Sequence, residues 1–350
     1  MTLTKHFSLE LPIIQAPMAG GISTVELAFQ VCQAGGLGFL AGGYKPAETM
    51  LKEIKELRMK TDKPFGINLF VPDQASPNWQ AIEEYRQVLE KSEKETWFEL
   101  GDVYQDDDDW ERKLSIVIEE KVPVVSFTFG CPSQSVFRSL KANGQLSAVT
   151  ITNAEEARTA YERGADFLCL QGQEAGGHRA TFQNEPNLDQ SFPLLKLIET
   201  IRKEVPSPII AAGGLMNGKE IYRVLTCGAD YVQLGTAFLL CRESGTSDVY
   251  KKALRDPAFQ ETSTTRAFTG RPAKGLVNQF MKKYSGFAPA AYPYIHQLTQ
   301  KMRKNAAQIG NPQYMSLWAG DGYKQIRELS ASDLLTKLKL EMEEAGYTPS

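Results

Sequence analysis

The chain has 350 residues and a formal net charge of −3, from 39 Lys and Arg against 42 Asp and Glu. This near balance differs from the basic excess of nucleic-acid-binding proteins, so we expect no nucleic-acid partner. Hydrophobic residues at 42% and charged residues at 23% are typical of a folded globular protein. No run approaches the roughly 18 apolar residues of a membrane span. No apolar leader opens the chain, so we expect a cytoplasmic protein without membrane contact.

The cysteines and histidines argue against a metal site. The five cysteines lie at wide spacings without a Cys-x-x-Cys pair, and the chain has only three histidines. Structural zinc sites need closely spaced groups of these ligands. We therefore expect no metal and interpret most of the thiols as buried apolar groups.

Short apolar runs, bounded by Gly or Pro, alternate with polar stretches long enough for helices. Near-continuous apolar character is typical of parallel strands that are buried on both faces. The runs predict strands at residues 12–18, 36–43, 64–72, 122–130, 146–152, 165–173, 207–215 and 231–240. The clearest helices between them are predicted at residues 24–34, 47–59, 153–163, 193–204 and 218–227.

Eight strand–helix units favour an α/β fold of the (β/α)8 TIM-barrel type, with an open doubly wound sheet as the alternative. The barrel would span residues 1–240 and be closed by an amphipathic helix at about 326–345. Residues 241–325 would form a smaller, mostly helical domain, inserted after strand 8, that covers the barrel mouth. The acidic run at 105–109 is interpreted as a solvated loop or helix start.

The ends of the seventh and eighth strands indicate a phosphate site. The seventh ends in Gly213 and Gly214, and the eighth carries Gln233, Leu234, Gly235 and Thr236. Glycine lets backbone N–H groups approach phosphate oxygens, and TIM barrels often bind phosphate after these two strands. Glycines that serve only tight turns are the alternative.

Other strand ends carry small residues and amides. Ala16, Pro17 and Met18 follow the first strand and leave room for a flat ring. Asn68 and Gln171 stand near the ends of apolar strands, where an amide is costly to bury without a hydrogen bond. Together with a phosphate site they suggest a bound mononucleotide, although Asn68 alone would equally fit a structural role.

His178 is the candidate catalytic residue. It follows Gly176 and Gly177 on a loop after the sixth strand, at the end of the barrel where chemistry occurs. Histidine can hold or take a proton near neutral pH. Cys131 follows the fourth strand, but no acid or base near it in sequence supports a nucleophilic thiolate, and its role is open.

These segments together resemble the nitronate monooxygenase family, formerly called 2-nitropropane dioxygenases. The resemblance rests on PIIQAPMAGGIST (12–24), AGGLGFLAGGY (34–44), PFGINLF (64–70), FTFGCPS (127–133), QGQEAGGHRATF (171–182), IIAAGGL (209–215) and VQLGTAFLLCRESGTS (232–247). TRAFTGRPAKGLVNQF (265–280), APAAYP (288–293) and LWAGDG (317–322) resemble the class I branch. Val25 departs from the family, which more often has Pro at this helix start.

The resemblance implies a barrel that holds FMN without a covalent link. His178 matches the active-site histidine of the family. The positions that match flavin-contacting residues are Ala16, Pro17, Met18, Asn68, Gln171, Gly176, Gly177, Gly213, Gly214, Gln233, Leu234, Gly235 and Thr236. Tyr292 and Tyr294 are weaker candidates for the substrate pocket.

The resemblance also implies the reaction. An alkyl nitronate, such as propionate 3-nitronate, would be oxidised with O2 through a flavin semiquinone to a carbonyl compound and nitrite. His178 would bind the nitro oxygens, or take the α-proton of a neutral nitroalkane. The alternatives are an FMN-dependent enoyl-acyl-carrier-protein reductase, an NAD(P)H:quinone reductase, and a non-redox barrel. The physiological nitronate and the use of NAD(P)H are open, as is a homodimer.

Overall fold

The larger of two sheets in the molecule consists of eight parallel strands. A computed structural model of the chain describes residues 9–73, 76–185 and 191–348, so residues 1–8 of the predicted barrel lie outside the described residues. The strands are β1 (Ile13–Gln15), β2 (Phe39–Ala41), β3 (Gly66–Phe70), β4 (Val124–Thr128), β5 (Leu146–Ile151), β6 (Phe167–Gln171), β8 (Ile209–Ala212) and β9 (Tyr231–Leu234). Their order is β1-β9-β8-β6-β5-β4-β3-β2, and each lies within a predicted range.

The sheet closes on itself beside β1. A parallel bridge joins Ile14 to Leu37, just before β2, while the other side of β1 pairs with β9. The N–H of Leu37 donates to the carbonyl of Ile13 at 3.0 Å, and the N–H of Gln15 donates to the carbonyl of Leu37 at 3.0 Å. The (β/α)8 barrel is therefore confirmed, and the open doubly wound sheet is wrong.

Alternate side chains of each strand enter two separate cores. In β6, Phe167 and Cys169 belong to a hydrophobic cluster to which all the barrel strands except β3 contribute side chains, so this cluster fills the barrel interior. Leu168 and Leu170 belong to the larger cluster between the sheet and its helices. Burial on both faces explains why the runs are almost continuously apolar.

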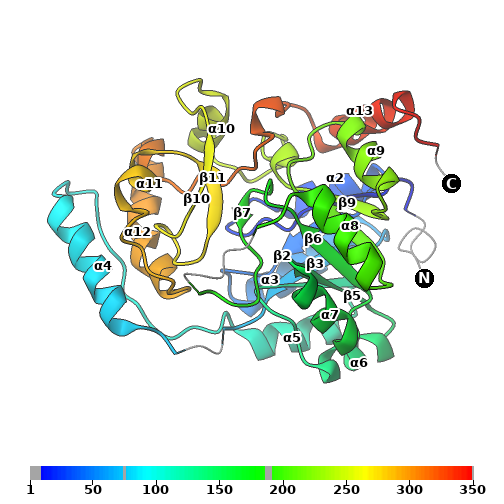
Figure 1. Ribbon diagram of the computed structural model, residues 1–350, viewed down its shortest axis with the longest axis horizontal. Coiled ribbons are helices and arrows are strands. Elements are labelled where there is room, and N and C mark those ends of the chain that lie inside the picture. Colours follow the sequence, from blue (N-terminus) through cyan, green and yellow to red (C-terminus); the bar gives the residue numbers. More distant parts are fainter. Residues whose placement is uncertain (1–8, 74–75, 186–190, 349–350) are drawn as a thin grey trace.

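Helices surround the barrel, and local caps fix several of their ends (Figure 1). Thr24 accepts a hydrogen bond from the N–H of Leu27 and so begins the first of them. Gly164, with a φ of 102°, ends α7. The helices of the barrel are α2 (Val25–Gln33), α3 (Ala47–Lys60), α5 (Trp110–Glu119), α6 (Gln134–Ala142), α7 (Ala154–Arg163), α8 (Leu194–Glu204), α9 (Gly218–Thr226) and α13 (Ala331–Glu344).

Most predicted strands are longer than the observed ones, and two predicted ranges extend furthest beyond the observed elements. The closing helix begins at Ala331 and not at residue 326, because the Ser330 hydroxyl accepts the N–H of Asp333 and caps it there. The eighth strand ends at Leu234, and residues Thr236–Phe238 form a 3-10 turn. The remaining predicted helices match the observed ones to within one residue at each end.

A smaller unit lies beside the barrel mouth, at the left of Figure 1. It contains α4 (Trp79–Ser92), β7 (Gly177–His178), α10 (Asp248–Arg255), β10 (Thr262–Thr265), β11 (Ala273–Leu276), α11 (Gln279–Tyr284), α12 (Tyr294–Gln308) and the 3-10 turns Pro312–Tyr314 and Tyr323–Gln325. The strand order β10-β11-β7 is antiparallel and includes a strand from the loop after β6.

This smaller unit also draws on the long connection between β3 and β4. Ile82, Tyr85 and Leu89 of α4 belong to the same hydrophobic cluster as Ile295 and Leu298 of α12. The unit thus takes part of its core from outside residues 241–325, and the division of the chain at residue 240 stays a prediction.

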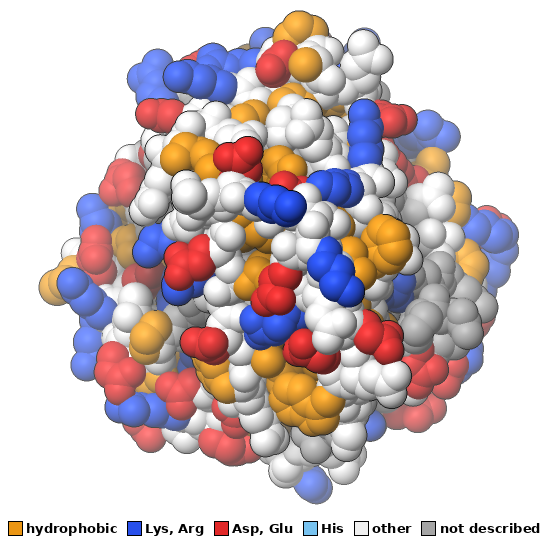
Figure 2. All heavy atoms as spheres, turned by 90° about the vertical axis from the view of Figure 1, so that its left-hand side faces the viewer, with side chains coloured by type: hydrophobic (Ala, Val, Ile, Leu, Met, Phe, Trp, Pro, Cys, Tyr) orange, Lys and Arg blue, Asp and Glu red, His pale blue; other side chains and the backbone are white. Residues whose placement is uncertain are grey.

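The outer face of the smaller unit carries both signs of charge. In Figure 2, Lys and Arg side chains lie interspersed with Asp and Glu, and the hydrophobic side chains are scattered among them. Within the described residues, none of the helices is both long and apolar enough to span a bilayer.

Candidate active site

A cavity of about 220 Å³, here called the inner cavity, opens at the carboxyl ends of the barrel strands. TIM barrels carry their active sites at this end of the sheet. The structure brings all the predicted site residues together around it: Ala16, Pro17, Met18, Asn68, Gln171, Gly176, Gly177, His178, Gly213, Gly214, Gln233, Leu234, Gly235 and Thr236. Their individual roles toward a ligand stay predictions.

Bare backbone amides line the cavity where β8 and β9 end. Gly213 and Gly214 have φ angles of 137° and 70°, a backbone region that favours glycine. Within the described residues, the N–H groups of Gly214, Gly235 and Thr236 make no hydrogen bond. Neighbouring free N–H groups of this kind form a concave site for an anion.

The loop after β1 is shaped by buried polar side chains. The Ser23 hydroxyl accepts the backbone N–H of Met18 at 2.8 Å and the side-chain amide of Gln15 at 2.9 Å. The carbonyl oxygen of the Gln15 amide accepts the N–H of Phe39 on β2 at 2.9 Å. These bonds fix the segment Ala16–Met18 against the barrel, a role for Gln15 and Ser23 that the sequence did not indicate.

The amide of Asn68 has a defined orientation. Its Oδ1 accepts hydrogen bonds from the hydroxyls of Ser126 at 2.8 Å and Thr128 at 3.0 Å, both on β4. With both hydroxyls donating to it, Oδ1 is occupied within the protein. The Nδ2 donor is then the group that Asn68 offers to a ligand in the inner cavity.

Gln171 holds the segment that carries His178. Its Nε2 donates to the carbonyl of His178 at 2.8 Å, and its Oε1 accepts the N–H of Ala180 at 2.9 Å. On the other side, β7 pairs with β11, where His178 faces Ala273. The backbone around His178 is therefore held by Gln171 on one side and by β11 on the other. The sequence pattern did not predict this role for Gln171.

The His178 ring lies among three aromatic rings. Its centroid is 5.7 Å from that of Phe129, 6.0 Å from Tyr292 and 5.5 Å from Trp318. Its Nε2 lies 3.0 Å from the hydroxyl of Thr269. Thr269 and Trp318 are site residues that sequence reasoning missed, and the only signal for them was their place in the segments 265–280 and 317–322.

His178 is neutral in this environment. Burial, followed by the positive charges of Arg271 and Arg303, lowers the pKa of His178 to about 3. Arg271 is fully buried, and burial lowers its pKa. Burial lowers the pKa of Arg303 to about 10, and this side chain donates to the carbonyl of His296 at 2.9 Å. At neutral pH the site therefore combines a neutral imidazole with two nearby cations.

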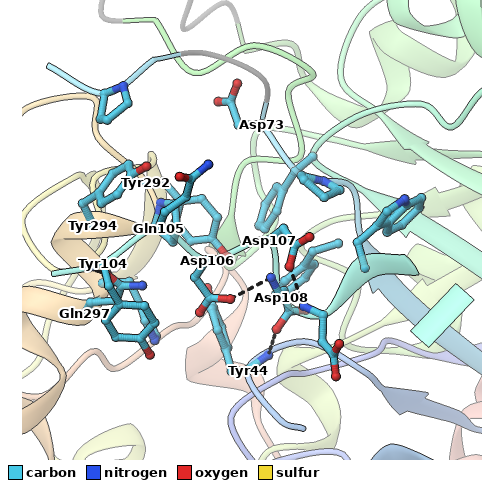
Figure 3. A pocket seen from close by; sticks show the side chains of 18 of the residues that line it. Tyr44, Asp73, Tyr104, Gln105, Asp106, Asp107, Asp108, Tyr292, Tyr294 and Gln297 are labelled. Carbon is cyan, nitrogen blue, oxygen red and sulfur yellow. Dashed lines mark hydrogen bonds between the residues drawn. The ribbon is translucent and has the colours of Figure 1, made fainter. Parts of the chain in front are cut away.

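A larger cavity of about 850 Å³, here called the outer chamber, adjoins the inner cavity at Tyr44, Phe70 and Phe129, which line both. Figure 3 shows this chamber between the acidic loop before α5 and the start of α12. Both predicted tyrosines, Tyr292 and Tyr294, line it. The outer chamber is lined by loops of the barrel and by α4 and α12 of the smaller unit.

Cys131 is buried, and its backbone carbonyl accepts a hydrogen bond from Arg163 at 2.6 Å. Burial raises the pKa of its thiol to about 11. A thiol of this kind is protonated at neutral pH and is a poor nucleophile.

Comparison with known proteins identifies the family. The profile of the nitronate monooxygenase family matches residues 2–341 of the chain. The chain belongs to the nitronate monooxygenase family. A probable nitronate monooxygenase of Bacillus subtilis (strain 168) is 38% identical over 338 residues, covering 95% of this chain and 96% of that protein. The nitronate monooxygenase of Pseudomonas aeruginosa is 36% identical over 348 residues, covering 97% and 98%.

Solved structures agree with this family. The chain is similar to nitroalkane oxidase from Streptomyces ansochromogenes, with a TM-score of 0.94, 48% identity and 98% of each chain covered. FabK from Thermotoga maritima is more distant, with a TM-score of 0.76, 27% identity and coverage of 98% of this chain and 96% of that one. Enzymes of the nitronate monooxygenase family depend on a flavin.

Proposed function

We propose that this protein is an FMN-dependent nitronate monooxygenase that oxidises alkyl nitronates with O2 to a carbonyl compound and nitrite. One observation carries the proposal: a single cavity at the barrel mouth presents an anion cradle at β8 and β9 and the imidazole of His178. The relatives named above carry out, by their names, reactions of nitro compounds. We assign the flavin cofactor as flavin mononucleotide because the cavity offers a site for one phosphate.

The residues present fit this cofactor. A phosphate would accept hydrogen bonds from the free N–H groups of Gly214, Gly235 and Thr236. An alanine at position 214 would place its Cβ 2.8 Å from the Cβ of Glu174, so the bare glycine keeps this turn open. The ring would lie beside Ala16–Met18, with Nδ2 of Asn68 as a donor to its edge. When bound, FMN would accept electrons from the substrate and deliver them to oxygen.

The protein groups bind and orient the nitronate. A nitronate is an anion, and the charges of Arg271 and Arg303 near His178 favour an anion at this position. A neutral imidazole donates one hydrogen bond, which a nitronate oxygen can accept. An imidazole with a pKa of about 3 is too weak a base to remove the α-proton of a neutral nitroalkane efficiently. We therefore assign His178 to substrate binding and orientation, with the preformed nitronate as substrate.

The test is a comparison of substrates on the purified, FMN-loaded protein. Nitrite release and oxygen uptake are measured with ethyl nitronate and, separately, with neutral nitroethane before it ionises. We expect oxidation of the nitronate, little reaction of nitroethane, and a large loss of kcat/KM in His178→Asn. A phosphate assay after denaturation identifies the flavin as FMN.

NADH and NADPH separate this proposal from the reductase alternatives. Anaerobic mixing with either nicotinamide should leave the flavin absorbance unchanged on the timescale of turnover. Rapid bleaching by a nicotinamide, together with no nitrite from ethyl nitronate, would replace the monooxygenase with a reductase. A protein that binds no flavin at all would point to a non-redox barrel.

A further inference from the structure

The outer chamber has room for more than the head group of a nitronate. Its volume of about 850 Å³ lies in the range that proteins use for ligands of drug size. It adjoins the inner cavity at Tyr44, Phe70 and Phe129, which line both spaces. A substrate whose nitronate group lies near His178 can therefore place a tail in the chamber, and the polar groups of the chamber wall decide which tail is favoured.

A buried guanidinium lies at the boundary between the two cavities. Arg271 is fully buried, lines the outer chamber and lies 4.4 Å above the ring centroid of Phe129, a ring that also packs against His178. Its Nη1 donates to the carbonyl of Thr181 at 2.7 Å. Within the described residues, its Nε and Nη2 have no hydrogen-bond partner, and Nη2 lies 4.0 Å from the carboxylate of Asp73, beyond hydrogen-bonding distance. Two N–H groups of a buried cation are therefore left for an acceptor that the protein does not supply.

A buried amide on α12 also lacks an acceptor. Gln297 lines the outer chamber and is only 6% exposed. Its Oε1 accepts the backbone N–H of Tyr104 at 2.8 Å, so Nε2 is the donor end of the amide. In the part of the chain that the structure describes, this Nε2 has no partner. Leaving a buried donor unpaired is unfavourable, so native sites that contain one commonly pair it with a ligand or water.

The neighbouring residue His296 offers a third donor. It is buried and lines the outer chamber. Nη2 of Arg303 lies 3.2 Å from Nδ1 of His296, and a guanidinium can only donate, so Nδ1 is unprotonated and Nε2 carries the ring N–H. Burial and the charge of Arg303 lower the pKa of His296 well below its ordinary value, so the ring is neutral at pH 7. Among the described residues, none accepts this Nε2–H.

The start of α12 adds free backbone donors. The helix begins at Tyr294, and the side chain of the preceding Pro293 gives it no cap. Within residues 9–73, 76–185 and 191–348, the N–H groups of Tyr294 and His296 make no hydrogen bond. Free N–H groups and the positive end of the helix dipole favour an anion at a helix start. The start of α12 therefore favours the same kind of ligand as the buried side chains that line the chamber.

The acidic loop before α5 does not cancel this preference. Asp106 and Asp107 line the chamber, as Figure 3 shows, but both are exposed to water. Water and salt strongly screen exposed charges, whereas a fully buried guanidinium is screened much less. The unpaired buried groups of Arg271 and Gln297 are donors, which only an acceptor can satisfy. A ligand of the chamber is therefore expected to bring an anionic group to these two side chains.

We infer that Arg271, His296 and Gln297 form a subsite for a second anionic group of the substrate, and that they favour nitronates with a carboxylate tail. The carboxylate would accept hydrogen bonds from Nε and Nη2 of Arg271 and from Nε2 of Gln297. The nitronate group would lie near His178, beside the same Phe129 ring. This inference rests on the proposed function for the identity of the head group and adds the residues that select the tail. Binding of a carboxylate to the subsite can be measured without turnover.

The first test compares tails of matched shape. Nitrite release is measured with the preformed nitronates of 3-nitropropanoate, 3-methyl-1-nitrobutane and 3-nitropropylamine, which end in a carboxylate, its neutral isostere and an ammonium group. We expect the highest kcat/KM for the carboxylate compound, about 10- to 100-fold above the neutral one, because a hydrogen bond to a charged group contributes about one to two orders of magnitude. Equal values for these two compounds, or the highest value for the ammonium compound, would overturn the inference.

Matched variants assign the preference to these side chains, measured as the ratio of kcat/KM for the carboxylate and neutral compounds. Gln297→Glu keeps the oxygen that accepts the Tyr104 N–H and replaces the free donor with a charged oxygen, so the ratio should fall roughly tenfold. Gln308→Glu makes the same change at the exposed opposite end of α12 and should keep the ratio. Arg271→Lys keeps the charge and should lower the ratio less than Arg271→Gln. If the buried Arg271 variants do not fold, Gln297→Glu decides: a ratio within about twofold of wild type would refute the subsite.

A binding measurement keeps the two proposals separate. Sodium butyrate is titrated into the purified full-length protein at constant ionic strength while tryptophan fluorescence is recorded, with butyramide as the neutral control. Trp79 lines the chamber and is a reporter for this titration. A saturable response to butyrate alone, weakened in Gln297→Glu, supports the subsite even if ethyl nitronate gives no nitrite. No saturable response to butyrate, or an equal response in Gln297→Glu, refutes the subsite even if ethyl nitronate is oxidised.

Discussion

The hydroxyl of Thr269 is expected to set the orientation and tautomer of His178. It lies 3.0 Å from His178 Nε2 and donates to the backbone carbonyl of Arg271 at 3.2 Å. The hydroxyl has a single proton, which it can donate to this carbonyl, with Nε2–H of His178 then donating to the hydroxyl, or to an unprotonated Nε2. In the second arrangement Nδ1 carries the ring N–H and can donate it to a nitronate oxygen, which is the tautomer that the proposed substrate binding needs. Thr269 acts through His178 and is a positioning residue.

Thr269→Val removes the hydroxyl at nearly constant volume. It leaves Nε2 of His178 and the Arg271 carbonyl without their hydroxyl partner, which should lower the free energy of unfolding by about 1–3 kcal/mol. The productive ring orientation loses a hydrogen bond of about 1 kcal/mol, so it should be populated roughly fivefold less. We expect kcat/KM for ethyl nitronate to fall about 5- to 30-fold, mostly in kcat.

The assay is nitrite release over a range of pH, combined with urea unfolding of the same variants. Thr269→Ser keeps the hydroxyl and should recover most of the activity. Thr265→Val is the matched control, because Thr265 is also buried in this segment but bonds to Ser285 at 2.7 Å and not to His178. If Thr269→Val keeps kcat/KM within about twofold, or if Thr265→Val lowers it equally, the positioning role is refuted.

Three further outcomes are expected. Gly214→Ala should lower the FMN content of the purified protein far more than Gly310→Ala. Both glycines have a φ near 70°, but only an alanine at position 214 would bring its Cβ to 2.8 Å from another atom. Equal flavin content in the two variants would contradict this prediction. His178 titrates near 6.5 when unfolded and at about 3 when folded, so the unfolded chain binds the extra proton as the pH falls. The free energy of unfolding should therefore drop by about 2 kcal/mol more in wild type than in His178→Asn between pH 7 and pH 5, measured by urea unfolding. Cys131→Ala should keep kcat/KM within about threefold, since its thiol is protonated and buried; complete loss in a folded, flavin-loaded variant would restore a chemical role for it.

The sequence by itself determined the barrel and the outline of the inner cavity. Strands buried on both faces must be apolar along their whole length, so runs such as residues 165–173 are recognisable without any partner. Gly213 and Gly214 were readable because a turn with positive φ restricts the residue type. His178 was readable from its position after the sixth strand, because parallel strands bring their carboxyl ends to one rim.

Only the tertiary structure decided what surrounds His178. Thr269 lies 91 residues from His178 along the chain and reaches it because β11 pairs with β7. Trp318 is still more distant in sequence, and no local periodicity records such a contact. The amide of Gln171 was expected to face a ligand, yet its bonds to the His178 segment depend on a loop conformation that no short pattern specifies. Periodicity reports which side of an element is buried, whereas a site assembled from several segments depends on how those segments pack.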